Sequence, residues 1–284
     1  MPDFLNADYW LAHRLELSYA AAAFVLFLAF LFATFPYTPA VKAALAPMGL
    51  RFESSGQGFA LPFGARLDKV RIQQLVPGAP PLFESESVRV SPALFSTLLF
   101  HPGINLSAKA YSGNLKLHVH RRGEGAAVSF DADKLDLASI GLLRQFGAAL
   151  GGELSGDGDI TFDPLSPTGD DGAAVLHAKG LLVRIPWPTG AIGLGDVELI
   201  LSLEHGVVKI GTIKASGGDL AIDGRGSIQL DPDDWQESRL ALQFTLTPSP
   251  TARQRLEFLL NFLPHPPGTG PYKLGGTVSS PAFS

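Results

Sequence analysis

The sequence predicts a mainly β protein: a single N-terminal transmembrane helix followed by a large, bent antiparallel β-sheet domain with a few short helices. Three observations lead to this fold class. A long uncharged apolar run stands near the N-terminus, and apolar and polar residues alternate with a period of two over much of the remaining chain. The 31 Gly and 22 Pro of the 284 residues favour turns over long helices. The boundaries we expect are a tail at 1–14, the membrane helix at 15–36 and the β-rich domain at 37–284.

The uncharged run extends from Leu17 to Val41, between Glu16 and Lys42. Its most apolar part, residues 17–35, would span about 28 Å as a helix, close to the roughly 30 Å hydrocarbon core of a bilayer. The run is longer than the apolar region of a cleaved signal peptide, and few buried helices of soluble proteins are apolar on all sides at this length. We therefore expect a retained anchor, with Leu17, Phe24, Leu28, Phe32 and Phe35 among its transmembrane residues.

The flanking charges leave the orientation of this helix open. Arg14 lies before it among acidic residues, whereas Lys42 and Arg51 follow it, so the excess of basic residues that marks cytoplasmic loops favours neither side.

Short helices are expected where Ser or Thr precedes Pro, because the hydroxyl can cap a first turn and proline suits the first helical position. Thr38-Pro39 predicts a helix to about Pro47, Ser91-Pro92 predicts one over 93–100, and Ser249-Pro250 predicts a longer one that ends before Pro264. A fourth helix is plausible at 139–150, where Gly151 and Gly152 would end it.

Between these helices the two-residue period indicates antiparallel strands with one apolar and one polar face. Glycines 224 and 226 interrupt one apolar row and mark a bend or bulge. The apolar face is either a core covered by helices or a second sheet, or the lining of a trough that holds acyl chains. The residues proposed for this candidate face are Leu199, Leu201, Leu203, Leu220, Ile222, Leu240, Leu242 and Phe244.

No residue pattern points to catalysis, and we predict no catalytic, cofactor-binding or metal-binding residues. Without cysteine the chain has no thiol chemistry, and its net charge of −5 argues against nucleic-acid binding. His118 and His120 share a strand face but lack a third ligand nearby in sequence, so solvated histidines are the better interpretation. Asp157, Asp159 and Asp163 lack the ligand spacing of a calcium loop.

Several segments resemble a known family. Phe35-Pro36-Tyr37 follows the apolar run, Leu61-Pro62-Phe63-Gly64 and Val88-Arg89-Val90-Ser91-Pro92 come next, and Gly276-Thr277-Val278-Ser279-Ser280-Pro281 closes the chain. Together they resemble the type II secretion system protein N family (general secretion pathway protein N), and the closing pattern also resembles the AsmA-like group of membrane-anchored periplasmic β proteins.

The resemblance implies a non-enzymatic protein in a bacterial inner membrane, with the bulk of the chain in the periplasm. It would act as a scaffold or assembly factor of the type II secretion system, binding the bilayer and either inner-membrane platform proteins or the secretin. The alternative is an AsmA-like protein that binds or transfers phospholipid. We expect no cofactor and no nucleic-acid partner.

Overall fold

The computed structural model describes residues 18–19, 23, 26–27, 30, 37–46, 49–60, 64–74, 81–93, 103–122, 125–140, 149–162, 170–184, 190–231, 235–261 and 263–283. The membrane-helix residues named above, Leu17, Phe24, Leu28, Phe32 and Phe35, lie outside these ranges. Among the residues that are described, no helix has both the length and the apolar character needed to cross a membrane.

A single 15-stranded antiparallel sheet forms the body of the protein, and its strands follow one another in chain order from β1 to β15, with β2 paired to β3 beside this path. The prediction of a mainly β fold built on one large antiparallel sheet with few helices is confirmed. The strands are β1 (Leu50–Glu53), β2 (Gly56–Phe59), β3 (Ala65–Gln74), β4 (Pro81–Pro92), β5 (Gly103–Ala110), β6 (Gly113–Arg122), β7 (Gly125–Asp136), β8 (Ala149–Phe162), β9 (Asp171–Arg184), β10 (Ala191–Glu204), β11 (Val207–Gly217), β12 (Leu220–Gln229), β13 (Arg239–Pro248), β14 (Tyr272–Gly276) and β15 (Pro281–Phe283).

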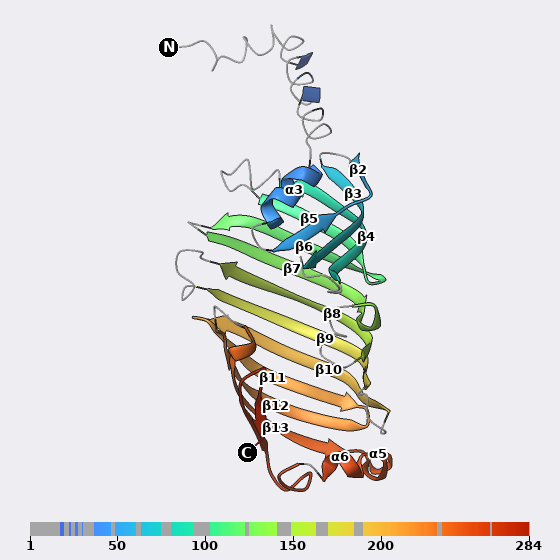
Figure 1. Ribbon diagram of the computed structural model, residues 1–284, viewed down its shortest axis with the longest axis vertical. Coiled ribbons are helices and arrows are strands. Elements are labelled where there is room, and N and C mark those ends of the chain that lie inside the picture. The colour runs from blue at the N-terminus through green and yellow to red at the C-terminus, as the bar shows by residue number, and fades with distance from the viewer. Residues whose placement is uncertain are drawn as a thin grey trace.

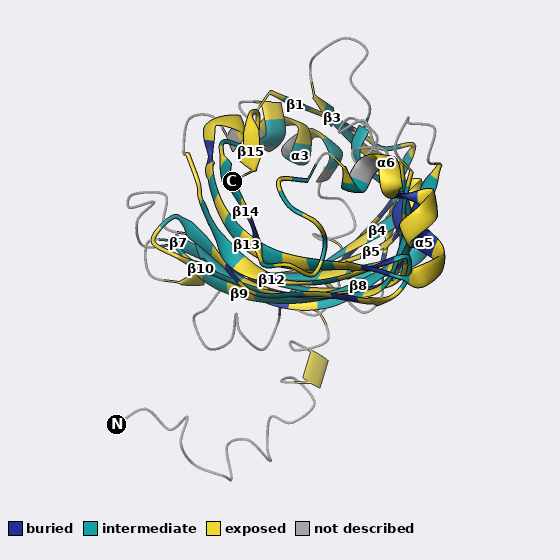
Figure 2. Ribbon diagram, turned by 90° about the horizontal axis from the view of Figure 1, so that it is seen from below, coloured by how far each residue is buried: buried dark blue, intermediate teal, exposed yellow. Residues whose placement is uncertain are grey.

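The strands stack along the long axis of the molecule, so the sheet is much longer than it is wide (Figure 1). Seen along that axis, the sheet curves around an open side, with α3 (Tyr37–Leu45) inside the curve at one end and α5 (Pro250–Arg255) at its rim at the other (Figure 2). The sheet therefore has a concave and a convex face.

The short helices agree only in part with those predicted from the Ser-Pro and Thr-Pro pairs. Ser249 caps α5 by accepting a hydrogen bond from the Ala252 N–H, as its Ser-Pro pair predicts, but the helix breaks at Leu256 and resumes as α6 (Glu257–Leu260). The helix expected after Thr38-Pro39 is α3, which starts at Tyr37. Two 3-10 turns are also described, η3 (Leu137–Ser139) and η6 (Trp235–Glu237).

Two helix predictions are wrong at their ends. Ser91 and Pro92 are the last residues of β4, where Ser91 pairs with Asn105 of β5, so the sheet ladder overrides the local capping signal. The helix expected over 139–150 is replaced at its end by β8, which begins at Ala149 and continues through both glycines expected to stop it. Residues 94–100 and 141–148 lie outside the described ranges.

Two clusters of buried side chains that pack on one another lie near the two ends of the sheet. Near the N-terminal end, Phe52, Leu67 and Val70 are buried beneath Val41 and Leu45 of α3. At the other end, Ile192 and Leu220 pack with Ala252 and Leu256 of the α5 segment, and partly buried neighbours surround both clusters.

Glycines 224 and 226 of β12 sit where a side chain has no room. A Cβ on Gly224 would lie 2.6 Å from the Phe244 Cβ, and one on Gly226 would lie 2.3 Å from the Ala241 carbonyl oxygen. The expected irregularity is present, but it lies in the neighbouring strand: β12 pairs regularly with β13, while the register with β11 shifts between Ile210 and Ile213. The glycines therefore permit the close approach of strands in the curved sheet.

We expect Gly226→Ala to lower the free energy of unfolding by about 1–3 kcal/mol, because the backbone contact at Ala241 cannot move aside. Gly275→Ala is the matched control, since its Cβ would meet nothing nearer than the Leu240 carbonyl oxygen at 3.8 Å. Denaturant unfolding of both variants, followed by circular dichroism, measures the difference. Equal denaturant midpoints for the two variants would show that a side chain at Gly226 is tolerated.

The cluster beneath α5 gives a second prediction. Leu256 is only 1% exposed, so Leu256→Ala should cost about 2–4 kcal/mol through lost burial and the cavity left behind. Phe258 lies two residues further along the chain and is 56% exposed, so Phe258→Ala should lower the free energy of unfolding by less than about 1 kcal/mol. Thermal unfolding of the two variants compares them, and a larger effect at Phe258 would contradict the assignment of the core.

Candidate binding face

The strand register collects apolar side chains on one face of the sheet. Directly paired residues of antiparallel strands point to the same side, so a row of partners can be followed from strand to strand. The central row is apolar or glycine at every position from β4 to β15: Val90, Leu106, Leu117, Phe130, Gly158, Ala174, Leu201, Ile210, Gly226, Leu242, Leu274 and Phe283.

Two more rows flank it and have the same character. One runs through Val88, Ala108, Leu115, Ala132, Gly156, Leu176, Leu199, Ile213, Gly224, Phe244 and Tyr272. The other runs through Pro92, Ile104, Val119, Val128, Ile160, Gly172, Leu203, Val208, Ile228 and Leu240. We call these three rows the apolar face.

All eight residues proposed from the sequence point to this side. Leu199, Leu201, Leu203, Leu240, Leu242 and Phe244 are members of the three rows. Ile222 pairs with Ala215 and Leu246, one rung further along, and Leu220 follows two residues earlier in β12, where it packs beneath α5.

The apolar face is the concave face. Val41 and Leu45 of α3 pack against the cluster that contains Leu67, and Leu67 pairs with Val88 of the second row, so it lies on the same side of the sheet. Helix α3 lies inside the curve (Figure 2). Curvature therefore brings the rows of distant strands towards one another around the open side.

Away from its two covered ends, this face remains accessible to solvent. The larger side chains of the central row, among them Leu106, Leu117, Phe130 and Leu201, are only partly buried, whereas mainly small residues such as Ala108 are fully buried. Ile104 is 48% exposed and Phe283 is 51% exposed. An apolar sheet face is normally buried against a second layer, so a partly exposed one of this length is unusual for a water-soluble domain.

The opposite, convex face is polar. One row of it runs through Asn105, His118, Ser129, Asp159, Ala173, Ser202, Lys209, Ser227 and Ala241. Exposed ion pairs join neighbouring strands there, such as Lys116 with Asp131 at 3.5 Å. At the hairpin after β10, the Lys209 ammonium donates a hydrogen bond to Glu204 and lowers the pKa of that carboxyl.

The candidate metal ligands do not assemble. The His118 and His120 rings lie 5.2 Å apart on the polar face, and the Nδ1 of His118 is within hydrogen-bond distance of the Asn105 side chain. Among the described residues, no three His, Cys, Asp or Glu side chains are grouped to hold a metal ion. Asp157 and Asp159 are strand residues of β8, and Asp163 lies outside the described ranges.

A polar cavity of about 670 Å³ opens beside β3 and β4, lined in part by Lys69, Arg71, Glu84 and Tyr111. Two of its lining charges neutralise each other, since Arg71 and Glu84 pair at 2.6 Å. The Tyr111 hydroxyl donates to the Leu82 carbonyl and accepts from the Glu84 N–H, and burial raises its pKa. These contacts give the tyrosine a structural role between β4 and the β5–β6 turn.

The apolar face is thus the largest feature that the fold leaves without a described covering. Comparison of the chain with protein-family models, with curated proteins and with solved structures finds no match.

Proposed function

We propose that the apolar face binds the acyl chains of phospholipids, and that the protein holds or transfers lipid at a bacterial inner membrane to which residues 17–35 anchor it. The observation that supports this most directly is the continuous, uncharged central row from Val90 to Phe283. A hydrocarbon chain needs no hydrogen bonds, so such a row suits it better than any polar ligand.

The dimensions of the row support the proposal. Neighbouring strands lie about 4.8 Å apart, so the rows from β4 to β13 extend over roughly 43 Å, longer than one acyl chain. Each methylene removed from water contributes about 0.8 kcal/mol, so about ten methylenes seated on the face would contribute about 8 kcal/mol before the cost of ordering the lipid. A net gain of that size would correspond to micromolar binding, so the ordering cost makes the expected affinity of a ten-methylene contact weaker than micromolar.

The free energy of burying apolar side chains also favours a ligand that covers this face. Complete burial of a leucine contributes about 1.5–3 kcal/mol, and the partly buried leucines of the central row gain only part of this in the protein alone. An acyl chain can follow the curved row and cover it, whereas a rigid second layer would have to match the curvature strand by strand.

Photo-crosslinking in intact cells tests the proposal on the full chain. A photoreactive amino acid in place of Leu201 should capture phospholipid, because this side chain stands in the central row. The same amino acid in place of Ser202, the next residue of β10 but on the polar face, is the matched control and should capture little. Mass spectrometry of the purified adducts identifies them, and equal capture at both positions would reject a lipid-binding face.

A second candidate function, taken from the sequence resemblance, is a scaffold or assembly factor of the type II secretion system. One structural observation favours a protein partner: β15 ends the sheet, and its three residues are all exposed. An exposed edge strand offers backbone groups to which a strand of another protein can add.

Deletion of the gene separates the two functions. Lipid transfer predicts an altered phospholipid distribution in the envelope with normal export of secreted enzymes. A secretion scaffold predicts that secreted enzymes accumulate in the periplasm while the lipid composition stays unchanged. Lipid analysis and assays of periplasmic enzyme activity in the same strain distinguish these results, and the second pattern would replace our first proposal.

A further inference from the structure

A second cavity lies on the polar face near the N-terminal end of the sheet, and its lining is strongly basic. It has a volume of about 400 Å³ and is formed by three neighbouring strands, β3, β4 and β5. We call it the basic cavity, and its lining residues are Arg66, Glu86, Ser87, Arg89, Ser107 and Lys109. Three cations in one small cavity are notable in a chain with a net charge of −5.

The strand register forces these cations together. Arg66 of β3 is the direct partner of Arg89 in β4, and Arg89 is in turn the direct partner of Ser107 in β5. Lys109 stands two residues beyond Ser107, diagonal to Arg89, at a typical separation of about 7–8 Å. Like charges placed directly opposite each other destabilise a strand pair, so an anion held between Arg66 and Arg89 would relieve their repulsion.

The acidic groups nearby do not neutralise the cations. Asp68 accepts a hydrogen bond from the Arg66 Nε at 2.9 Å, but both side chains are about half exposed, and such surface pairs contribute little. The terminal nitrogens of Arg66 keep their donors for another acceptor. Among the described residues, neither the Arg89 nor the Lys109 side chain has an acidic partner, and Glu86 is shared with the polar cavity on its other side.

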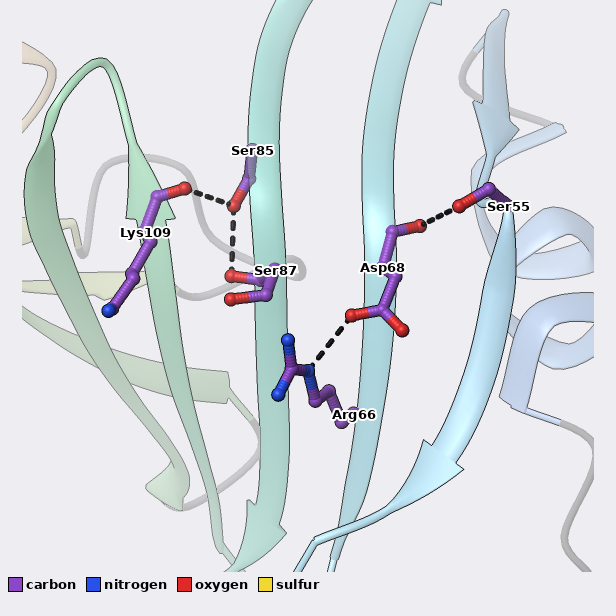
Figure 3. A network of polar contacts seen from close by, with 6 residues as sticks. All are labelled: Ser55, Arg66, Asp68, Ser85, Ser87 and Lys109. Atoms are coloured by element: carbon purple, nitrogen blue, oxygen red, sulfur yellow. Dashed lines mark hydrogen bonds and ion pairs between the residues drawn. The ribbon is translucent and has the colours of Figure 1, made fainter.

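Hydrogen bonds between neighbouring segments connect the strands that form the cavity. Ser85 is only 7% exposed, and its hydroxyl is within hydrogen-bond distance of two backbone oxygens, 2.8 Å from that of Lys109 and 3.0 Å from that of Ser87. On the other side, the Ser55 hydroxyl donates to the Asp68 carbonyl. Figure 3 shows this frame, with Arg66 held by Asp68 on β3 and Lys109 on the far side of β4. The cations are therefore presented by fixed backbone.

We propose that the basic cavity binds a phosphate group, with Arg66, Arg89 and Lys109 neutralising its charge and the Ser87 and Ser107 hydroxyls donating hydrogen bonds to its oxygens. Planar guanidinium groups and an ammonium are the side chains that recognise phosphate oxygens most strongly. The phosphate belongs either to a free small molecule or to the headgroup of a lipid at the membrane surface. The proposal does not depend on the apolar face, which lies on the opposite side of the sheet.

Binding to the full chain, purified in a neutral detergent, tests the proposal. Isothermal titration with inorganic phosphate forms one arm, and addition of phosphatidic acid to the micelles, read by thermal unfolding, forms the other. Saturable binding of inorganic phosphate assigns the cavity to a free anion. Stabilisation by phosphatidic acid, without binding of inorganic phosphate, assigns it to a lipid headgroup. Sodium chloride at matched ionic strength controls for screening in both arms.

The variants Arg89→Gln and Lys109→Gln should each weaken binding about tenfold, because each removes one charge-assisted hydrogen bond. Lys273→Gln is the matched control, since it removes an exposed cation of the same polar face on β14, outside the cavity. In phosphate-free buffer of low ionic strength, Arg89→Gln should also unfold at a higher temperature than the wild type, because its repulsion with Arg66 is gone. The proposal is overturned if neither ligand binds, or if Lys273→Gln weakens binding as much as the cavity variants do.

Discussion

The structure depends on one constraint, the antiparallel pairing that keeps apolar and polar side chains on opposite faces along the whole sheet. A slip of one residue in any strand would move all its apolar side chains to the polar face. The bulges preserve the alternation: Ile210 and Ile213 are three residues apart, yet both stand in apolar rows because the register shifts between them. Lys134 does the same for β7, where its positive φ of 53° lets Ala132 and Leu135 pair on the same side.

Burial is divided unevenly along this sheet. The two terminal clusters bury their side chains fully near α3 and α5, while most of the larger side chains in the middle of the apolar face are only partly buried. Each central strand is held mainly by its two neighbours, so stability there resembles a sum of nearest-neighbour terms, as in repeat proteins. A curved face of this kind can stay open to a ligand without exposing the core that holds its ends.

Much of this architecture could be predicted from the sequence, because a period of two is a local signal. The alternation of apolar residues from Leu199 to Leu203 and from Leu240 to Phe244 is visible directly in the sequence. The helix signals were less reliable: Ser91-Pro92 is a good cap locally, but the ladder to Asn105 and Ile104 decides its conformation. Pairing between distant strands is a non-local property, which is why the bulge at 210–213 and the meeting of Arg66 with Arg89 could not be predicted.

The two faces offer different chemistry because a single-layer sheet exposes both of them. In a β-sandwich one face of each sheet is buried against the other sheet, and only the polar faces are exposed to solvent. Here helix α3, the α5 segment and His265, which stacks on Tyr272, cover parts of the concave face among the described residues. The convex face carries the basic cavity on β3, β4 and β5, at the same end of the sheet as α3. The acyl chain proposed for the concave face and the phosphate proposed for the convex face would therefore occupy separate sites. A ligand that binds the folded state on either face would add stability through its own binding.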